Sequence, residues 1–235
     1  MDVLELAFAL ATGAVAGSII NMVATRLPAE GDPAVIGPPL RPRTQAEDAF
    51  AFVPWLGAWQ RSTGGLDLPK LGTDIGATLV SVIAFLRYDE WLVSARTAVF
   101  ALILLLILRI DWQHHLIFTI TIVPSIAIAL VFQALDSAGA FAWAVAASAG
   151  AALVFTLLFF LALIIYRRRA LGFGDVLLAG LIGAMTGPSV HIAILLGMFL
   201  AAAGGLFLIA IRVRSRTDYI PYGAYLCLGA MIVIL

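Results

Sequence analysis

The chain has 235 residues, of which 63% are hydrophobic and only 12% are charged. Soluble domains carry about 25% charged residues and about 45–50% apolar ones, so a water-soluble fold is excluded. A bilayer accepts this much apolar surface, provided that helices satisfy the backbone polar groups. The formal net charge is zero, which argues against a nucleic-acid partner, and the single cysteine excludes a disulfide framework. We therefore expect an all-α, polytopic membrane protein.

The apolar segments predict about eight transmembrane helices, because a span needs about 20 largely apolar residues. In chain order they are residues 4–25, 73–88, 92–110, 115–135, 139–166, 171–187, 189–211 and 219–235. The domain organisation that follows is a first transmembrane helix (1–27), a loop (28–72) and a membrane-embedded core (73–235). The loop is rich in proline and glycine and shows no helical period, so we expect no independent core there.

The basic residues support this topology. If both termini lie outside, twelve of the 14 lysines and arginines fall on one side. These twelve are Arg26, Arg41, Arg43, Arg61, Lys70, Arg109, Arg167, Arg168, Arg169, Arg212, Arg214 and Arg216. The other side has only Arg87 and Arg96. The positive-inside rule assigns the basic side to the cytoplasm.

Two aspartates stand at the edges of predicted spans, where an ionisable group costs at least about 2.5 kcal/mol on insertion scales. Asp111 follows an apolar run that ends at Ile110, and Asp175 opens the sixth span. In the expected topology both lie at the same depth, at cytoplasmic helix ends. Two close carboxyl groups share one proton, so they can serve as base and acid in peptide hydrolysis. A helix cap or a solvated boundary residue is the alternative for each aspartate alone.

Two glycines, an asparagine and a histidine are further candidates for a role in a site. Gly172 and Gly174 precede Asp175 and would let a substrate backbone approach closely. Asn21 continues a spacing of four residues from two glycines of the first span, which favours helix packing over substrate binding. His114, next to a second histidine beside Asp111, has no metal-ligand spacing, so we expect no metal.

Four segments, in order along the chain, resemble the prepilin peptidase family. Gly172–Asp175 resembles its GxGD motif, which preflagellin peptidases and presenilin-type proteases share. The other three are Gly17–Pro28, similar to GSFLNVxxxRLP; the segment from Asp111 to Pro124, similar to IDxxxxxxIPDxLTxP; and Ile220–Ala230, similar to IPFGPFLALGA. The chain departs from the family at Phe118-Thr119, where the pattern has PD, and at Leu177, where a lysine is frequent. Its first loop also lacks the cysteine pairs that bind zinc in many members.

The resemblance implies a multi-pass aspartic endopeptidase of the bacterial cytoplasmic (inner) membrane. Its substrates would be type IV prepilins or pseudopilins, whose basic leader is cut after a glycine. Asp111 and Asp175 would be the catalytic pair, while Arg26 belongs to the RLP part of the first motif. Cleavage needs no cofactor. Members that also N-methylate the product use S-adenosylmethionine, and the divergent loop leaves that activity open.

Two other functions remain compatible with the sequence. One is a catalytically degenerate relative that acts as a membrane scaffold of a pilus or secretion system. The other is a small transporter with an intramembrane proton site, although no predicted span carries a charge at its middle.

The helix ends also suggest roles within the pair. Asp175 opens a helix, and helix N-termini favour a negative charge, whereas Asp111 closes one, where the opposite partial charge applies. We therefore expect Asp175 to be the ionised base and Asp111 to hold the shared proton more often.

Overall fold

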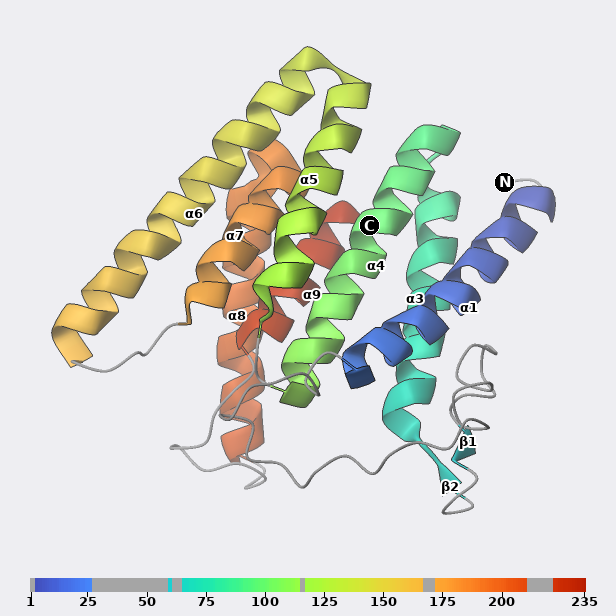
Figure 1. The fold of residues 1–235 in the computed structure, drawn as a ribbon, viewed down its shortest axis with the longest axis horizontal. Coiled ribbons are helices and arrows are strands. Elements are labelled where there is room, and N and C mark those ends of the chain that lie inside the picture. Colours follow the sequence, from blue (N-terminus) through green and yellow to red (C-terminus); the bar gives the residue numbers. More distant parts are fainter. Residues whose placement is uncertain (1–2, 27–58, 61–64, 115–116, 167–171, 211–221) are drawn as a thin grey trace. The chain divides into compact units, whose positions relative to one another are not determined.

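A computed structural model describes residues 3–26, 59–60, 65–114, 117–166, 172–210 and 222–235 (Figure 1). Helices account for nearly all of these residues, and β1 (Trp59–Gln60) pairs with β2 (Gly65–Leu66) in a short antiparallel ladder. The all-α membrane class is therefore confirmed. Most of the expected loop 28–72 lies outside the described residues. The chain divides into two compact units, Met1–Arg109 with Leu235 and Ile110–Ile234.

The first unit is built on close packing between α1 (Val3–Arg26) and α3 (Leu68–Arg87). A Cβ added to Gly13 would lie 2.6 Å from Cα of Thr78, and one added to Gly17 would lie 2.8 Å from Cα of Asp74. Any larger residue would force the two backbones apart. This is the packing that the four-residue spacing of small residues predicts.

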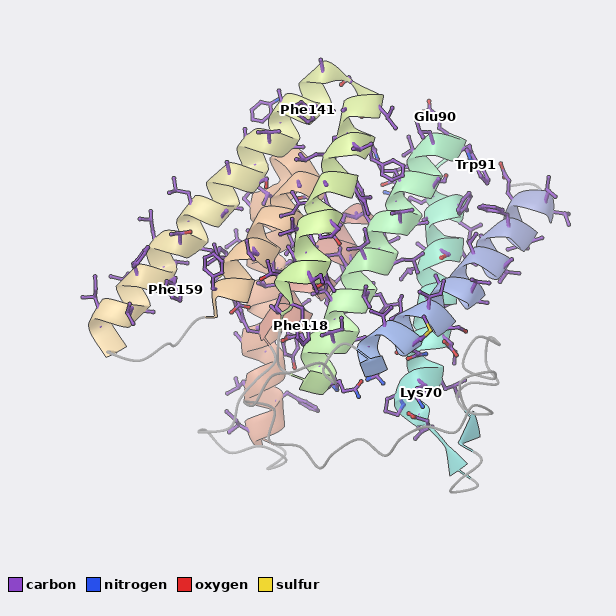
Figure 2. All side chains as sticks on the ribbon, in the orientation of Figure 1. Lys70, Glu90, Trp91, Phe118, Phe141 and Phe159 are labelled. Atoms are coloured by element: carbon purple, nitrogen blue, oxygen red, sulfur yellow. The ribbon has the colours of Figure 1, made fainter. Side chains whose placement is uncertain are left out.

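The ends of α3 are set by local chemistry. Asp67 caps the helix by accepting the backbone N–H of Lys70 at 3.3 Å, and Pro69 fits the first turn, so α3 begins before the expected residue 73. After α3 ends at Arg87, Trp91 opens α4 (Trp91–His114) (Figure 2). The centroid of the Trp91 ring lies 4.8 Å from that of Phe8 and 5.1 Å from that of Phe85. The three rings tie the first three long helices of the unit together.

The second unit contains the end of α4 and five more α-helices. These are α5 (Thr119–Asp136), α6 (Ala138–Tyr166), α7 (Phe173–Thr186), α8 (Val190–Ala210) and α9 (Tyr222–Ile234). Figure 1 shows α5 and α6 running beside α7. A Cβ on Gly183 of α7 would lie 2.5 Å from the carbonyl oxygen of Ala147 on α6. Gln133 of α5 donates its side-chain amide to the carbonyl oxygen of Met185 at 3.1 Å. Glycine contacts and one buried amide therefore hold the helices around α7.

The break between α7 and α8 has an identifiable cause. Gly187 ends α7 with φ +53°, in the left-handed region, and Pro188 follows within the short 3-10 helix η3 (Gly187–Ser189). Glycine adopts this conformation at no steric cost, and proline cannot continue the preceding helix.

The eight membrane spans predicted from the sequence are slightly too many. Within the described residues, six stretches are long and apolar enough to cross a membrane. Phe173–Phe207 counts as one of them, because α7 by itself has 14 residues, or about 21 Å, against a hydrocarbon core of about 30 Å. Tyr222–Ile234 is shorter still. The sequence predicted the helices, but two of them are too short to be counted as separate spans.

Candidate active site

Asp111 lies in the last turn of α4, which runs on to His114. Its side chain is 1% exposed, and Oδ2 accepts a hydrogen bond of 2.7 Å from the backbone N–H of Ala224. Ala224 belongs to the first turn of α9, where N–H groups have no partner within their own helix. The carboxyl group of α4 therefore caps a helix that follows it by more than a hundred residues.

Asp175 lies in the first turn of α7 and is 7% exposed. Its Oδ2 accepts the backbone N–H of Gly172 at 3.1 Å, and its own N–H donates to the carbonyl oxygen of Gly172, also at 3.1 Å. This reciprocal contact resembles a capping box. Asp175 therefore helps to cap α7, which is the alternative role that the sequence allowed for it. It is also buried.

The structure brings the two carboxyl groups into one site. Asp111 is close enough to Asp175 to act on it electrostatically. Ile117 lies between their supporting turns: its Cβ is 2.7 Å from a Cβ built on Gly174, and its Cδ1 is 2.7 Å from one built on Gly223. The same Cβ on Gly223 would lie 3.0 Å from Oδ2 of Asp111. Three helix ends, those of α4, α7 and α9, therefore meet around the pair.

The helix ends are where the sequence predicted them, and the structure adds one contact. Asp111 lies in the last turn of α4 and Asp175 in the first turn of α7. Asp111 also accepts an N–H from the start of α9, as Asp175 accepts one at the start of α7. The Asp111 carboxyl group therefore lies between a helix C-terminus and a helix N-terminus, so the helix dipoles do not by themselves distinguish base from acid, and the assignment of the two roles stays a prediction.

The two predicted glycines differ in their surroundings. Gly172 is exposed, and a Cβ there would lie 3.3 Å from Oδ2 of Asp175. The space beside Gly174 is filled by Ile117. Gly174 therefore allows α7 to pack closely against Ile117, just before α5. Of the two glycines, Gly172 is the one exposed at the surface.

Sequence reasoning assigned no role to the start of α9, although it noted the pattern there. Ala224 binds Asp111, Tyr222 is half-buried beside Asp175, and the buried thiol of Cys227 lies near both aspartates. The signal was present, because the segment from Ile220 matches a family pattern. Its residues are neither charged nor metal ligands, so their chemistry alone did not point to a site.

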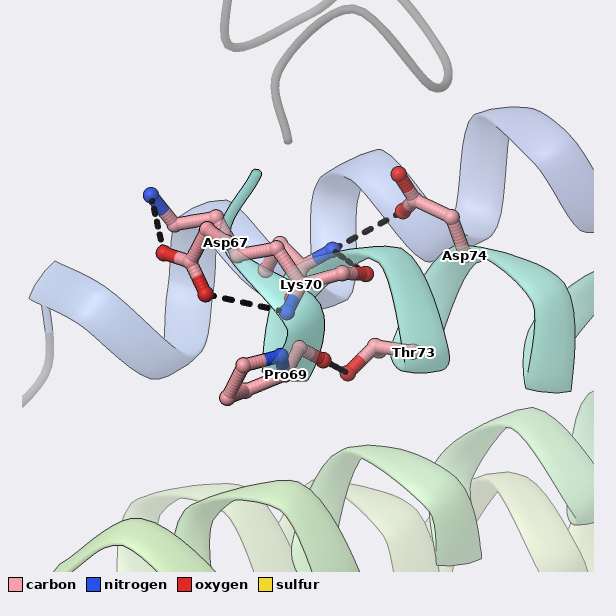
Figure 3. A network of polar contacts seen from close by, with 6 residues as sticks. Asp67, Pro69, Lys70, Thr73 and Asp74 are labelled. Atoms are coloured by element: carbon pink, nitrogen blue, oxygen red, sulfur yellow. Dashed lines mark hydrogen bonds and ion pairs between the residues drawn. The ribbon is translucent and has the colours of Figure 1, made fainter. Parts of the chain in front are cut away.

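Asn21 lies in the first unit and bonds to residues of α3. Figure 3 labels the α3 side of this second polar cluster, including Lys70 and Asp74. Nδ2 of Asn21 donates to Oδ1 of Asp74 at 2.8 Å and to the carbonyl oxygen of Lys70 at 3.0 Å, while Lys70 forms an ion pair of 3.0 Å with Asp67. Asp74 is 2% exposed, and sequence reasoning missed it. The signal was again an ionisable residue within an apolar helix. The side chain of Arg26 lies outside the described residues.

A metal site has no support in the part of the chain that the structure describes. No group of three histidine, cysteine, aspartate or glutamate side chains there is arranged to hold an ion. The side chains of His114 and His115 lie outside that part. The absence of a metal therefore stays a prediction.

Comparison with known proteins gives one match. Residues 98–209 match the type IV leader peptidase family. The matched segment contains both Asp111 and Asp175, and it ends before α9. No curated protein and no solved structure matches the chain.

Proposed function

Because residues 98–209 of this chain match the type IV leader peptidase family, we propose that the protein is an aspartic endopeptidase that removes the leader peptide from type IV prepilins or pseudopilins. The family match and the apolar helices support a multi-pass membrane protein with a protease domain of the leader peptidase kind. The observation that carries the aspartic class is that two buried carboxyl groups, Asp111 and Asp175, lie near one another where Ile117 packs against the starts of α7 and α9.

The pair has the chemistry that peptide hydrolysis requires. One carboxylate takes a proton from a water molecule, whose oxygen bonds to the carbonyl carbon of the scissile peptide. The other, protonated carboxyl group gives its proton to the carbonyl oxygen. The carboxyl group that took the proton from water then gives it to the leaving nitrogen, the tetrahedral intermediate returns a hydroxyl proton to the other carboxylate, and the C–N bond breaks. Burial strengthens these interactions, and the N–H donors at Ala224 and Gly172 fix the orientation of the two groups.

The charge distribution along the sequence supports a reaction at the cytoplasmic face of a bacterial inner membrane. A prepilin has a hydrophobic helix in the bilayer and a basic leader in the cytoplasm, so the bond to be cut would lie at the boundary between them. N-methylation with S-adenosylmethionine is a separate prediction. The loop 28–72, which the resemblance links to it, lies mostly outside the described residues, and no step is derived through that cofactor.

The decisive experiment is co-expression of the full chain with candidate prepilins or pseudopilins, with leader loss measured by mass spectrometry. Asp111→Asn and Asp175→Asn should each abolish cleavage while the protein stays inserted in the membrane. Asp89→Asn is the matched control, because it makes the same change at an exposed position. Cleavage should also persist in strong chelators.

Three outcomes would contradict the proposal. Near wild-type cleavage by either variant would refute the catalytic pair. Loss of cleavage in a chelator, restored by zinc, would refute the aspartic class. An intact wild type that associates with prepilins but cleaves none of them would favour the degenerate scaffold.

A further inference from the structure

A buried arginine near the end of α4 has a side-chain donor that no described residue satisfies. Arg109 is 9% exposed, and its Nε has no hydrogen-bond partner in the part of the chain that the structure describes. A long cationic side chain at a membrane boundary usually extends its charged head into water. Arg109 is buried instead, and a buried charged donor without an acceptor is costly. Its guanidinium group therefore needs a further acceptor.

The packing of α4 directs Arg109 toward the first turn of α3, within the first unit. Leu105 of α4 clusters with Ala77 of α3, and its Cδ1 lies 3.7 Å from a Cβ built on Gly76. Arg109 follows Leu105 by four residues, so both lie on the same face of α4. Asp67, which caps the start of α3, is the carboxylate that acts electrostatically on Arg109.

The group formed by Asp67, Lys70 and Arg109 has two cations and one carboxylate. Nζ of Lys70 lies 3.0 Å from Oδ2 of Asp67 (Figure 3). Asp74 lies one turn farther along α3, where it accepts the side-chain amide of Asn21. The side chains of Lys70 and Asp67 are 17% and 22% exposed, so an anion from outside can reach this group. Such an anion would balance the second cation and give Arg109 an acceptor.

The same group lies at the depth of the lipid headgroups. α3 and α4 are both long and apolar enough to cross a membrane; Asp67 directly precedes one span, and Arg109 lies near the end of the other. Leu68, next to Asp67, is 71% exposed, which is typical of the place where an apolar span begins. The distribution of basic residues along the sequence supports a cytoplasmic location for this end. Anionic phospholipids there present phosphate oxygens, which a guanidinium group binds with two parallel hydrogen bonds.

We propose that Arg109 and Lys70 bind the phosphate group of an anionic phospholipid in the cytoplasmic leaflet. The phosphate oxygens accept hydrogen bonds from the Arg109 guanidinium group, and Lys70 adds a second positive charge. Inorganic phosphate offers the same oxygens, but it has no acyl chains to hold it at this depth. The binding is independent of the proposed peptidase function, because neither residue belongs to the candidate active site.

The test compares phosphatidylglycerol with phosphatidylcholine, which has the phosphate group but no net charge. The full chain, purified in detergent and freed of native lipid, is titrated with either lipid, and bound lipid is counted by native mass spectrometry. Arg109→Gln removes the charge and the Nε donor. Arg87→Gln is the matched control, because it makes the same change at an exposed position at the other end of α3.

We expect Arg109→Gln to bind phosphatidylglycerol about tenfold more weakly than the wild type, the effect of losing a hydrogen bond between charged groups. Arg87→Gln should bind it as the wild type does, and the wild type should bind phosphatidylcholine more weakly. Equal binding of phosphatidylglycerol by Arg109→Gln and the wild type would overturn the proposal. An equal loss in both variants, or equal affinity of the wild type for the two lipids, would overturn it as well.

A second measurement follows thermal unfolding of the same samples in phosphate-free buffer. Without lipid, Arg109→Gln should unfold at the wild-type temperature or above it, because it removes an incompletely satisfied buried charge. Added phosphatidylglycerol should raise the midpoint of the wild type more than that of the variant. If Arg109→Gln unfolds well below the wild type without lipid, the chain itself satisfies Arg109 and the proposal is overturned. Equal protection of the wild type by the same concentration of inorganic phosphate would overturn the lipid source.

Discussion

Gly223→Ala is the substitution that tests the geometry of the candidate site most directly. A Cβ at this position would lie 2.7 Å from Cδ1 of Ile117, 3.0 Å from Oδ2 of Asp111 and 3.3 Å from Cγ of Asp111. Ordinary carbon contacts are about 3.5–4.0 Å. The terminal methyl group of Ile117 can rotate away. The Asp111 carboxyl group is held by the N–H of Ala224, so it must shift against that bond.

The two consequences differ in size. Overpacking of this kind costs about 1–3 kcal/mol of folding stability, which a folded protein with a large helical core tolerates. A 1 Å misplacement of a catalytic group can cost roughly 10²-fold in rate. The smaller shift required here should lower the cleavage rate by about tenfold, which corresponds to about 1.4 kcal/mol of transition-state stabilisation.

The assay compares initial rates of leader release by the purified full chain, alongside thermal unfolding of the same samples. Gly150→Ala on α6 is the matched control, because a Cβ there meets no atom within 4 Å. If Gly223→Ala is folded and cleaves at the wild-type rate, Asp111 does not act from the position seen in the structure. An equal loss of rate in Gly150→Ala would show that the effect is not local to the site.

Two further predictions concern stability. Gly183→Ala should lower the free energy of unfolding by about 1–3 kcal/mol. The reason is that the new Cβ would lie 2.5 Å from the carbonyl oxygen of Ala147, a backbone atom that cannot rotate away. If denaturant unfolding finds Gly183→Ala as stable as Gly150→Ala, the close packing of α6 and α7 is contradicted. Asn21→Leu should cost about 1–3 kcal/mol, because Asp74 loses a buried N–H donor. Replacing both residues with leucine should recover part of that loss, and a double variant less stable than Asn21→Leu would refute this account.

The candidate site also illustrates how buried carboxyl groups are accommodated beside apolar helices. Burying a charge without partners is costly, yet Asp111 is 1% exposed and Asp175 is 7% exposed. In the part of the chain that the structure describes, each accepts a backbone N–H from a helix N-terminus, a place where donors are left over and a negative charge is favoured. The same contacts give each carboxyl group a donor and give an N–H of the helix start an acceptor.

The amino-acid sequence by itself determined the class of the protein and the identity of the candidate pair. Its apolar content excludes a water-soluble fold, because no soluble surface could cover it. Asp111 and Asp175 stand out because an ionisable group is expensive beside apolar spans, and the spacing of Gly13 and Gly17 predicts the close packing seen between α1 and α3. These conclusions depend on local composition and spacing, which a sequence carries directly.

Only the tertiary structure decided which groups meet. The donor to Asp111 is a backbone N–H of Ala224, which no side-chain chemistry could indicate and which follows it by more than a hundred residues. The same holds for Asn21 and Asp74, where a donor on α1 meets an acceptor on α3. Whether a helix end points at a carboxyl group depends on how whole helices pack. That packing is set by all the contacts between the helices, and these contacts join residues far apart in the sequence. The relation between Asp111 and the start of α9 therefore became visible only in three dimensions.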